Sequence, residues 1–300
     1  MVDIPQLRAF VEVSFQRNIK RASTSLRLTP SPVGRTIREL EREFGHQLFE
    51  REYHDLVPTE AAGWLLPRAV EILAQVDSVI AGPDSSRRPL RLGVTPLAPT
   101  RYTDRLAQAL VESDESAEPL ADDMSFALLH MLSHGRLDGV IVHLPVDLPG
   151  ITARPLGRYQ FYAFMPEEAE YSAPRINITE LRDTPVAMLP IAFQPMPMTA
   201  LLNQLVEVGI GEVLELQLPD LMNLTSRLRQ AGAVMLNANA PDVPISSMMA
   251  RPGLKALPLD GINFEFQIGV AWRSADSTCS RRVAALAERL APDGDGIEII

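Results

Sequence analysis

Residues 18–44 read NIKRASTSLRLTPSPVGRTIRELEREF, and they combine helical spacing with an excess of positive charge. From Arg17 to Arg42 there are seven cations and two acids, whereas the whole chain of 300 residues carries a net charge of −10. A positive segment on an acidic protein is typical of a module that docks on the phosphates of nucleic acid. Residues 59–300 carry a net charge of −11, so any such contact should come from the front of the chain.

The apolar residues of this region repeat at the spacing of α-helices. The pattern predicts a first helix over residues 5–15 and a second, short helix that Asn18 caps. Either Thr29 or Ser31 caps a third helix, because each precedes a proline that is tolerated at the first helical position. Gly45 can end this helix. The apolar positions of this third helix are spaced by four, three and four residues: Val33, Ile37, Leu40 and Phe44.

Two short helices, a tight turn and a longer helix with outward arginines make a helix-turn-helix. After it, residues 48–51 and 56–57 predict a small hairpin with its tip at residues 52–55, which would form a wing. Thr59 is placed to cap the next helix.

Here the chain resembles the LysR-type transcriptional regulators. The resemblance rests on about fifteen positions in order: Leu7-Arg8-Ala9-Phe10, Arg21-Ala22, Leu26, Thr29-Pro30-Ser31-Pro32, Arg35, Ile37, Leu40-Glu41, Gly45, Leu48-Phe49-Glu50-Arg51 and Pro58-Thr59-Glu60-Ala61. It implies a winged helix-turn-helix domain over residues 1–58. The third helix would enter the major groove of double-stranded operator DNA while the wing touches the backbone.

Seven residues are expected to contact DNA: Thr29, Ser31, Pro32, Val33, Arg35, Arg38 and Arg51. Thr29 and Ser31 would donate hydrogen bonds to phosphate at the helix start. Pro32 and Val33 would meet thymine methyls. The arginines suit phosphate or a guanine edge, with Arg51 as a phosphate clamp. The alternative is that the arginines form a solvated face paired with the neighbouring glutamates.

The chain departs from the family pattern at Ser23, where a second alanine is usual, at Gly34, and at Gly232-Ala233-Val234, where the family often has Gly-x-Gly. Gly34 stands where the family usually has serine, and glycine inside a helix costs about 0.5–1 kcal/mol relative to alanine. The change also removes a hydroxyl that would donate to phosphate. We therefore expect DNA binding that is weaker than, or differently registered from, that of a typical member.

Residues 59–81 predict one long helix, roughly 34 Å in length. Its apolar positions give one continuous face: Ala62, Leu65, Leu66, Ala69, Ile72, Leu73, Val76, Val79 and Ile80. A fifty-residue winged domain cannot cover such a face, so we expect a partner helix from a second subunit. The resemblance implies the same homodimer and a further homotetramer. Packing within the same chain is the alternative, and residues 82–89 form the hinge.

Residues 90–300 alternate strands with helices, which predicts an α/β fold. The resemblance implies an effector-binding domain of two α/β subdomains that resemble a periplasmic binding protein, with residues 90–162 and 269–300 in the first and 163–268 in the second. The crossing strands are placed near Ala163 and Gly269. Residues 135–138 resemble the family's Gly-x-Leu-Asp turn.

A ligand is expected in the cleft between these subdomains, at the carboxyl ends of strands. We expect contacts from Thr95 and Thr100 on one side and from Phe193 and Gln194 on the other, although Thr95 and Thr100 equally suit a turn and a helix cap. The helix after Thr95 offers amides that suit a carboxylate. Residues 188–198 hold methionines and Phe193 but no clear cation. The expected effector is a small, partly apolar carboxylate.

Other classes fit the sequence less well. His130 and His134 lie four residues apart, a spacing that holds zinc on a helix, but the glutamate of a His-Glu-x-x-His motif is missing, so we expect no enzyme, cofactor or metal. A binding protein of the periplasmic type and a DNA-bending protein are the remaining alternatives. A single cysteine, the lack of a signal peptide and the lack of a membrane span predict a cytoplasmic protein.

Overall fold

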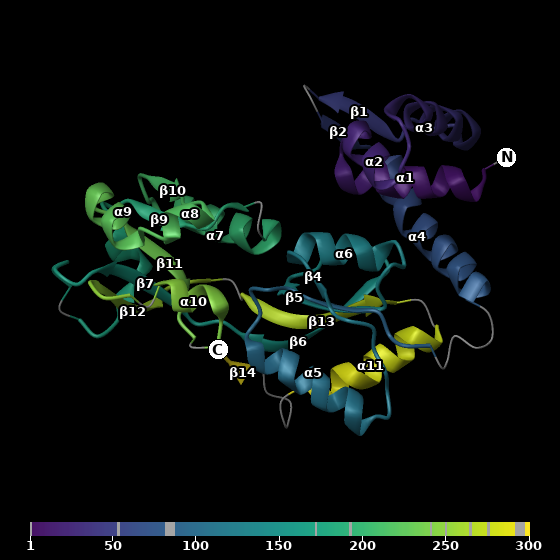
Figure 1. The fold of residues 1–300 in the computed structure, drawn as a ribbon. Coiled ribbons are helices and arrows are strands. Elements are labelled where there is room, and N and C mark those ends of the chain that lie inside the picture. The colour runs from purple at the N-terminus through teal and green to yellow at the C-terminus, as the bar shows by residue number, and fades with distance from the viewer. Residues whose placement is uncertain are drawn as a thin grey trace.

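The structure is a computed structural model in which a helical N-terminal region is joined by one long helix to a larger region with two sheets (Figure 1). It describes residues 2–52, 55–81, 88–171, 173–191, 194–240, 242–249, 251–263, 266–274, 277–291 and 298–300. Most of the predicted hinge and the predicted contact Phe193 lie outside these residues. No described helix is long and apolar enough to cross a membrane.

The N-terminal helices begin where their caps predict. α1 (Ile4–Gln16) starts with a capping box in which the Asp3 side chain accepts from the Gln6 amide, and α2 (Ile19–Ser25) starts at the Asn18 side chain. Thr29 is the N-cap of α3 (Pro30–Phe44), which decides between the two predicted starts. Gly45 ends α3 with a φ of 82°, in the left-handed region that glycine reaches without strain.

These helices enclose one small core. Its fully buried members come from α1, α2 and α3 and from the segments that follow: Phe10, Val11, Ala22, Val33, Leu40, Leu48 and Ala69. The predicted wing is confirmed as an antiparallel hairpin of β1 (Phe49–Glu52) and β2 (Asp55–Pro58). The Thr59 hydroxyl then accepts from the Ala62 amide at 3.2 Å.

The apolar residues of the long helix α4 (Glu60–Ala81) fall into a buried group and an exposed group. Leu65, Ala69 and Leu73 are buried in the N-terminal core, and α4 packs against α1. Ile72 and Val79 remain 42% and 80% exposed. Packing within the chain therefore covers part of the predicted stripe, while its far end remains open to a partner.

The remaining chain forms two six-stranded sheets. The first has the order β14-β6-β13-β5-β3-β4 and the second the order β10-β9-β11-β7-β12-β8. The strands of the first are β3 (Leu92–Val94), β4 (Ala121–Asp122), β5 (Gly139–Leu144), β6 (Ile151–Arg158), β13 (Gln267–Arg273) and β14 (Glu298–Ile299). Those of the second are β7 (Phe161–Pro166), β8 (Ile176–Asn177), β9 (Val186–Met188), β10 (Val213–Glu215), β11 (Val234–Ala238) and β12 (Leu254–Asp260).

Helices cover both sheets. In the first, α6 (Ser125–Ser133) lies on one face, and α5 (Thr100–Glu112) and α11 (Thr278–Leu290) lie on the other (Figure 1). As predicted, the C-terminal helix returns to the first sheet. The second sheet is accompanied by α7 (Pro195–Val208), α8 (Leu218–Leu221), α9 (Leu224–Ala231), α10 (Pro244–Met249) and the short 3₁₀ turn Ile178–Leu181.

The chain changes sheet earlier than the sequence predicts. It crosses between the end of β6 at Arg158 and the start of β7 at Phe161, and between the end of β12 at Asp260 and the start of β13 at Gln267. The Tyr159 amide donates to the Phe266 carbonyl at 2.7 Å, which holds the two crossings together. Phe161 therefore belongs to the second sheet and Ile268 to the first, close to the expected crossings near Ala163 and Gly269.

The last residue of the predicted turn at residues 135–138 is a buried carboxylate, Asp138. Asp138 has no exposed side-chain surface and receives a two-point contact from Arg88 at 2.7 and 2.8 Å. Arg91 donates from its backbone at 2.9 Å and its guanidinium at 3.0 Å, and Arg273 lies at 3.5 Å. Burial alone would raise the pKa of Asp138, but the hydrogen bonds from Arg88 and Arg91 outweigh it and lower the pKa to about 2.

The Asp138→Asn variant should lose about 3–5 kcal/mol of unfolding free energy at neutral pH, because three guanidinium groups then face a neutral amide. The native carboxylate has a lowered pKa, so its contribution is complete above about pH 4 and is lost as the pH falls toward 2. Urea titrations at several pH values should show the unfolding free energies of the native protein and the Asp138→Asn variant becoming equal in acid. The exposed pair partner Asp260 is the control, and Asp260→Asn should change little. A similar loss in both variants would contradict the role of Asp138.

Candidate nucleic-acid interface and ligand cleft

α3 separates an apolar buried face from a polar exposed one. Val33, Ile37 and Leu40 are buried against α1 and α2. Thr29, Ser31, Pro32, Arg35 and Arg38 are exposed on the other side. The Thr29 hydroxyl makes no capping bond to the helix, so it is not committed to the helix start. The helix thus brings five of the seven predicted DNA contacts onto one surface.

Two of the predicted contacts behave differently. Val33 is 0% exposed, so the prediction that it reaches a thymine methyl is wrong. The reason is its place in the apolar stripe, since a side chain that fills the core cannot also lie in a groove. Arg51 lies in β1 of the wing, and its side chain is outside the described atoms.

The arginines of α3 carry the charge of this surface. The Arg35 side chain is 77% exposed and its Nε lies 2.8 Å from Glu39 Oε1, one helical turn on. Exposed pairs at this spacing are weak and are screened by salt. The pair is the solvated arrangement that the sequence left as an alternative, and a phosphate that brings more negative charge can replace it.

Gly34 is buried on α3, yet it has room for a side chain. A Cβ placed there would meet the Arg38 guanidinium and the Ile19 side chain at 3.7 Å, which is ordinary van der Waals contact. The glycine is therefore not required by packing.

The predicted ligand contacts lie at the junction of the two subdomains. Thr95 follows β3 and is 1% exposed, and its hydroxyl has no hydrogen-bond partner among the described residues. Thr100 is the first residue of α5 rather than its cap, and its amide donates to the Asp242 carbonyl at 2.9 Å. Asp242 also pairs with Arg101 at 2.9 Å. The helix start that was expected to receive a ligand carboxylate is thus covered by the second subdomain.

Gln194 from α7 reaches a histidine that the sequence did not single out for the cleft. Its Nε2 donates to His143 Nδ1 at 3.0 Å, which leaves His143 Nε2 to donate to the Tyr159 hydroxyl at 3.1 Å. Burial lowers the pKa of His143 to about 3, so the ring is neutral. Burial also raises the pKa of Tyr159.

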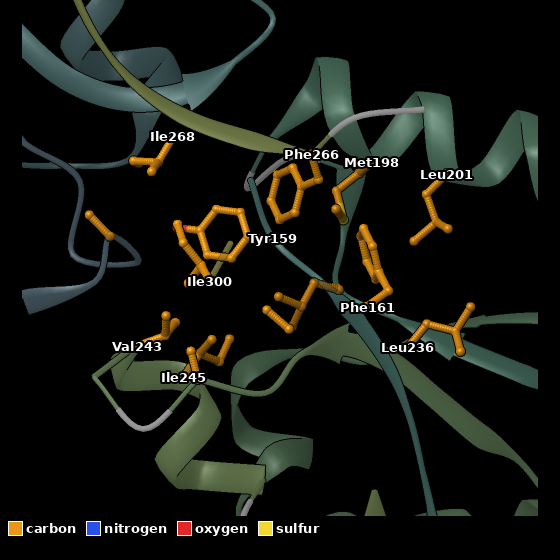
Figure 2. Close-up of a cluster of buried hydrophobic side chains, with 14 of the residues drawn as sticks. Tyr159, Phe161, Met198, Leu201, Leu236, Val243, Ile245, Phe266, Ile268 and Ile300 are labelled. Atoms are coloured by element: carbon orange, nitrogen blue, oxygen red, sulfur yellow. The ribbon is translucent and has the colours of Figure 1, made fainter. Parts of the chain in front are cut away.

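Aromatic rings fill the cleft around this histidine. Phe266 stacks on His143 at 5.1 Å between centroids, and it also contacts Tyr159 and Phe161. Figure 2 shows Tyr159, Phe161 and Phe266 converging with aliphatic side chains from both subdomains. The cavity left between them has a volume of about 20 Å³, room for about one water molecule. The cleft is therefore closed in this conformation.

A second hollow lies beside the crossing strands. It has a volume of about 400 Å³ and a polar lining that includes Arg158, Gln160 and Asp260. Tyr159 and Phe161 line both this hollow and the closed cleft, so these two rings separate them. This hollow could not be predicted from sequence, because its walls come from residues that meet only where the chain changes sheet.

The comparisons with known proteins agree with this architecture. Residues 4–63 match the "Bacterial regulatory helix-turn-helix protein, lysR family", and residues 83–293 match the "LysR substrate binding domain". The chain therefore belongs to the LysR family of bacterial regulatory proteins. Both domains that the sequence resemblance implied are confirmed.

The sequence identity to individual relatives is low. The chain is 31% identical over 192 residues to a "Probable hydrogen peroxide-inducible genes activator" of Mycobacterium avium, a match that spans 62% of each protein. It shares its fold with full-length OxyR from Pseudomonas aeruginosa, with a TM-score of 0.55, 18% identity and coverage of 97% and 95% of the two chains. It is similarly related to CbnR in complex with its target DNA, with a TM-score of 0.50, 17% identity and coverage of 97% and 100%.

Replacing Gly34 by alanine should raise the free energy of unfolding by about 0.5–1 kcal/mol, because alanine favours the helix and the site has room for it. Thermal or urea unfolding measures the change. Gly45→Ala is the matched control, since its φ of 82° is strained for alanine and the variant should be less stable. A destabilised Gly34→Ala protein would show that the packing at α3 is tighter than described.

Replacing Thr95 by valine should stabilise the ligand-free protein by about 1 kcal/mol. The buried hydroxyl has no described partner, and such a group costs roughly 1–3 kcal/mol. The exposed Thr100 provides the control, and Thr100→Val should leave the urea midpoint nearly unchanged. A less stable Thr95→Val protein would mean that the hydroxyl is satisfied by water.

Proposed function

We propose that this protein is a sequence-specific DNA-binding transcription regulator that responds to a small-molecule effector. The observation that carries the proposal is the polar face of α3, where Thr29, Ser31, Pro32, Arg35 and Arg38 are exposed while the opposite face fills the core. A helix with that division lies in the major groove in helix-turn-helix proteins. CbnR, which shares the fold, has been solved with its target DNA.

DNA recognition by such domains uses two copies. Ile72 and Val79 on α4 are exposed and apolar, and a second α4 would remove them from water. Two winged domains held this way would read two half-sites at a fixed separation. We therefore propose a homodimer through α4, and a homotetramer as the larger assembly.

The residues of α3 divide into positioning and reading roles. Thr29 and Ser31 at the helix start suit phosphate, and Pro32 suits a thymine methyl. Arg35 and Arg38 suit phosphate or guanine, and Arg51 on the wing suits the flanking backbone. Val33 is not among the proposed DNA contacts because it is buried.

The effector is proposed to bind between the subdomains, where Thr95 and Gln194 provide polar groups in an apolar setting. Because the cavity is small, binding requires the cleft to open by moving Asp242 from α5 and displacing the aromatic rings. The lining favours a small, partly apolar molecule, and the amides of α5 favour a carboxylate on it. Such a ligand shifts the balance between closed and open forms.

A disulfide response to peroxide is not proposed, although relatives are named for peroxide induction. Cys279 is the only cysteine of the chain, so no disulfide can form within it. It is buried in α11, and its sulfur lies 3.3 Å from Arg88. A noncovalent effector fits this chain better than an oxidant.

The Arg35→Ala variant should bind operator DNA more weakly, and the slope of log affinity against log salt should fall by about one. Operator fragments obtained by genome-wide mapping of bound sites provide the DNA, and binding isotherms at several salt concentrations provide the measurement. Arg289→Ala removes an exposed arginine from α11 and should leave the isotherms unchanged. An unaltered isotherm for Arg35→Ala would remove Arg35 from the interface, and a lack of discrete bound sites would overturn the proposed function.

A further inference from the structure

Three side chains that bind metals in other proteins meet between the N-terminal region and the first subdomain. Glu12 on α1 lies between His130 and His134 at the end of α6, with Oε1 3.1 Å from His130 Nε2 and Oε2 3.1 Å from His134 Nε2. The Glu12 side chain has no exposed surface and each histidine side chain is 8% exposed. Figure 1 shows α6 on the face of the first sheet that is turned toward the N-terminal helices.

Three buried polar atoms of this cluster lack a hydrogen-bond partner among the described residues. Glu12 Oε2, His130 Nε2 and His134 Nε2 are all buried, and none makes a hydrogen bond of acceptable geometry among the described atoms. His134 Nδ1 lies 2.8 Å from the His130 carbonyl and donates to it, so the proton of a neutral ring is on Nδ1 and its Nε2 is bare. His130 Nε2, His134 Nε2 and a Glu12 oxygen thus converge on one point, where a bound cation would satisfy all three atoms.

Among the described residues, no arginine or lysine pairs with Glu12. In the described part of the chain, the two imidazoles are the ion-pair partners of Glu12, and Gln16 adds a neutral contact at 3.2 Å. Phe15 packs on both rings, with centroids at 5.3 and 5.4 Å, and keeps water from one side. A buried carboxylate in apolar surroundings is stable only if it is neutralised.

We propose that Glu12, His130 and His134 bind a divalent transition-metal ion, with Zn²⁺ as the representative ion. Their ligand atoms lie within 4.8 Å of one another. Ligands around tetrahedral zinc at its usual bond lengths are about 3.3 Å apart, so the 3.1 Å contacts already match and only a small closing of the histidines is needed. Two imidazoles and one carboxylate suit Zn²⁺, Co²⁺ or Ni²⁺ rather than Mg²⁺ or Ca²⁺.

The third ligand of the proposed site comes from a helix of the other domain. His130 and His134 follow the i, i+4 spacing on α6, whereas Glu12 belongs to α1, which packs against α3. The ion would join the winged domain to the first subdomain through direct bonds. Its role is structural linkage, and no catalytic step is assigned to it.

The first experiment titrates the metal-free, full-length protein with Zn²⁺ by calorimetry. The wild type should bind one ion per chain, and Glu12→Gln and the double variant His130→Gln/His134→Gln should bind more than about tenfold more weakly. His46→Gln removes an exposed histidine outside the cluster and is the matched control. Zn²⁺ should also raise the melting temperature of the wild type and of the control, but not of the cluster variants.

The second experiment needs no variant, which protects the proposal if a substitution prevents folding. X-ray absorption of the zinc-loaded wild type should show two imidazoles and oxygen ligands, and the Co²⁺ form should show the visible bands of a tetrahedral site. The proposal is overturned if the wild type binds no stoichiometric Zn²⁺, if folded Glu12→Gln binds as tightly as the wild type, if His46→Gln loses binding equally, or if absorption shows fewer than two imidazoles. A simple Glu12–histidine ion pair would give the first of these results.

Discussion

The position of the first subdomain depends on one buried carboxylate. Asp138 is held by Arg88 from the start of the domain, by Arg91 before β3 and by Arg273 at the end of β13. The Arg273 guanidinium also donates to the carbonyls of Leu132 and Leu137, so the same ion network fixes the end of α6. Because α6 ends at the histidines that face Glu12, the contact between the two domains rests on Asp138 as well. Removing that charge would loosen the sheet, the helix and the domain contact together.

Among the described residues, the two buried carboxylates Glu12 and Asp138 are neutralised differently. Asp138 has guanidinium partners, which stay charged at any pH that a protein tolerates, and its site is therefore permanent. Glu12 instead faces the Nε2 atoms of two imidazoles, which are also ligand atoms of the proposed metal site. Burial would raise the pKa of Glu12, and the contacts with His130 and His134 lower it well below its usual value instead. The Asp138 site lies inside one subdomain, whereas the Glu12 cluster lies between domains, where a bound metal ion would join them.

Local signals predicted most of the N-terminal region from the sequence. Asn18 acts at a helix end through its side chain, and Thr29 and Gly45 act through their backbone conformation, so their roles could be predicted without knowledge of the fold. The buried Val33 was the exception, because its periodicity and its assumed DNA contact point to opposite faces of α3. The errors elsewhere concern residues that meet only after folding. Neither the Asp242 carbonyl on the Thr100 amide nor the contact of Glu12 with α6 leaves a pattern in the chain. The first crossing was expected near Ala163 and lies a few residues earlier, where Tyr159 and Gln160 carry no turn signal.

α6 connects the ligand cleft to the domain contact. Ser125, its first residue, accepts a hydrogen bond from the His143 amide at 3.1 Å, and its hydroxyl lies 3.2 Å from His143 Nδ1. His130 and His134, at its other end, face Glu12. The helix has nine residues, roughly 13 Å of rigid backbone between the two contacts. Opening of the cleft by the proposed effector would displace the ring stacked on His143 and break its bond to Gln194, at the residue that Ser125 contacts. Since the end of the same helix faces Glu12 of α1, α6 links these two sets of contacts directly.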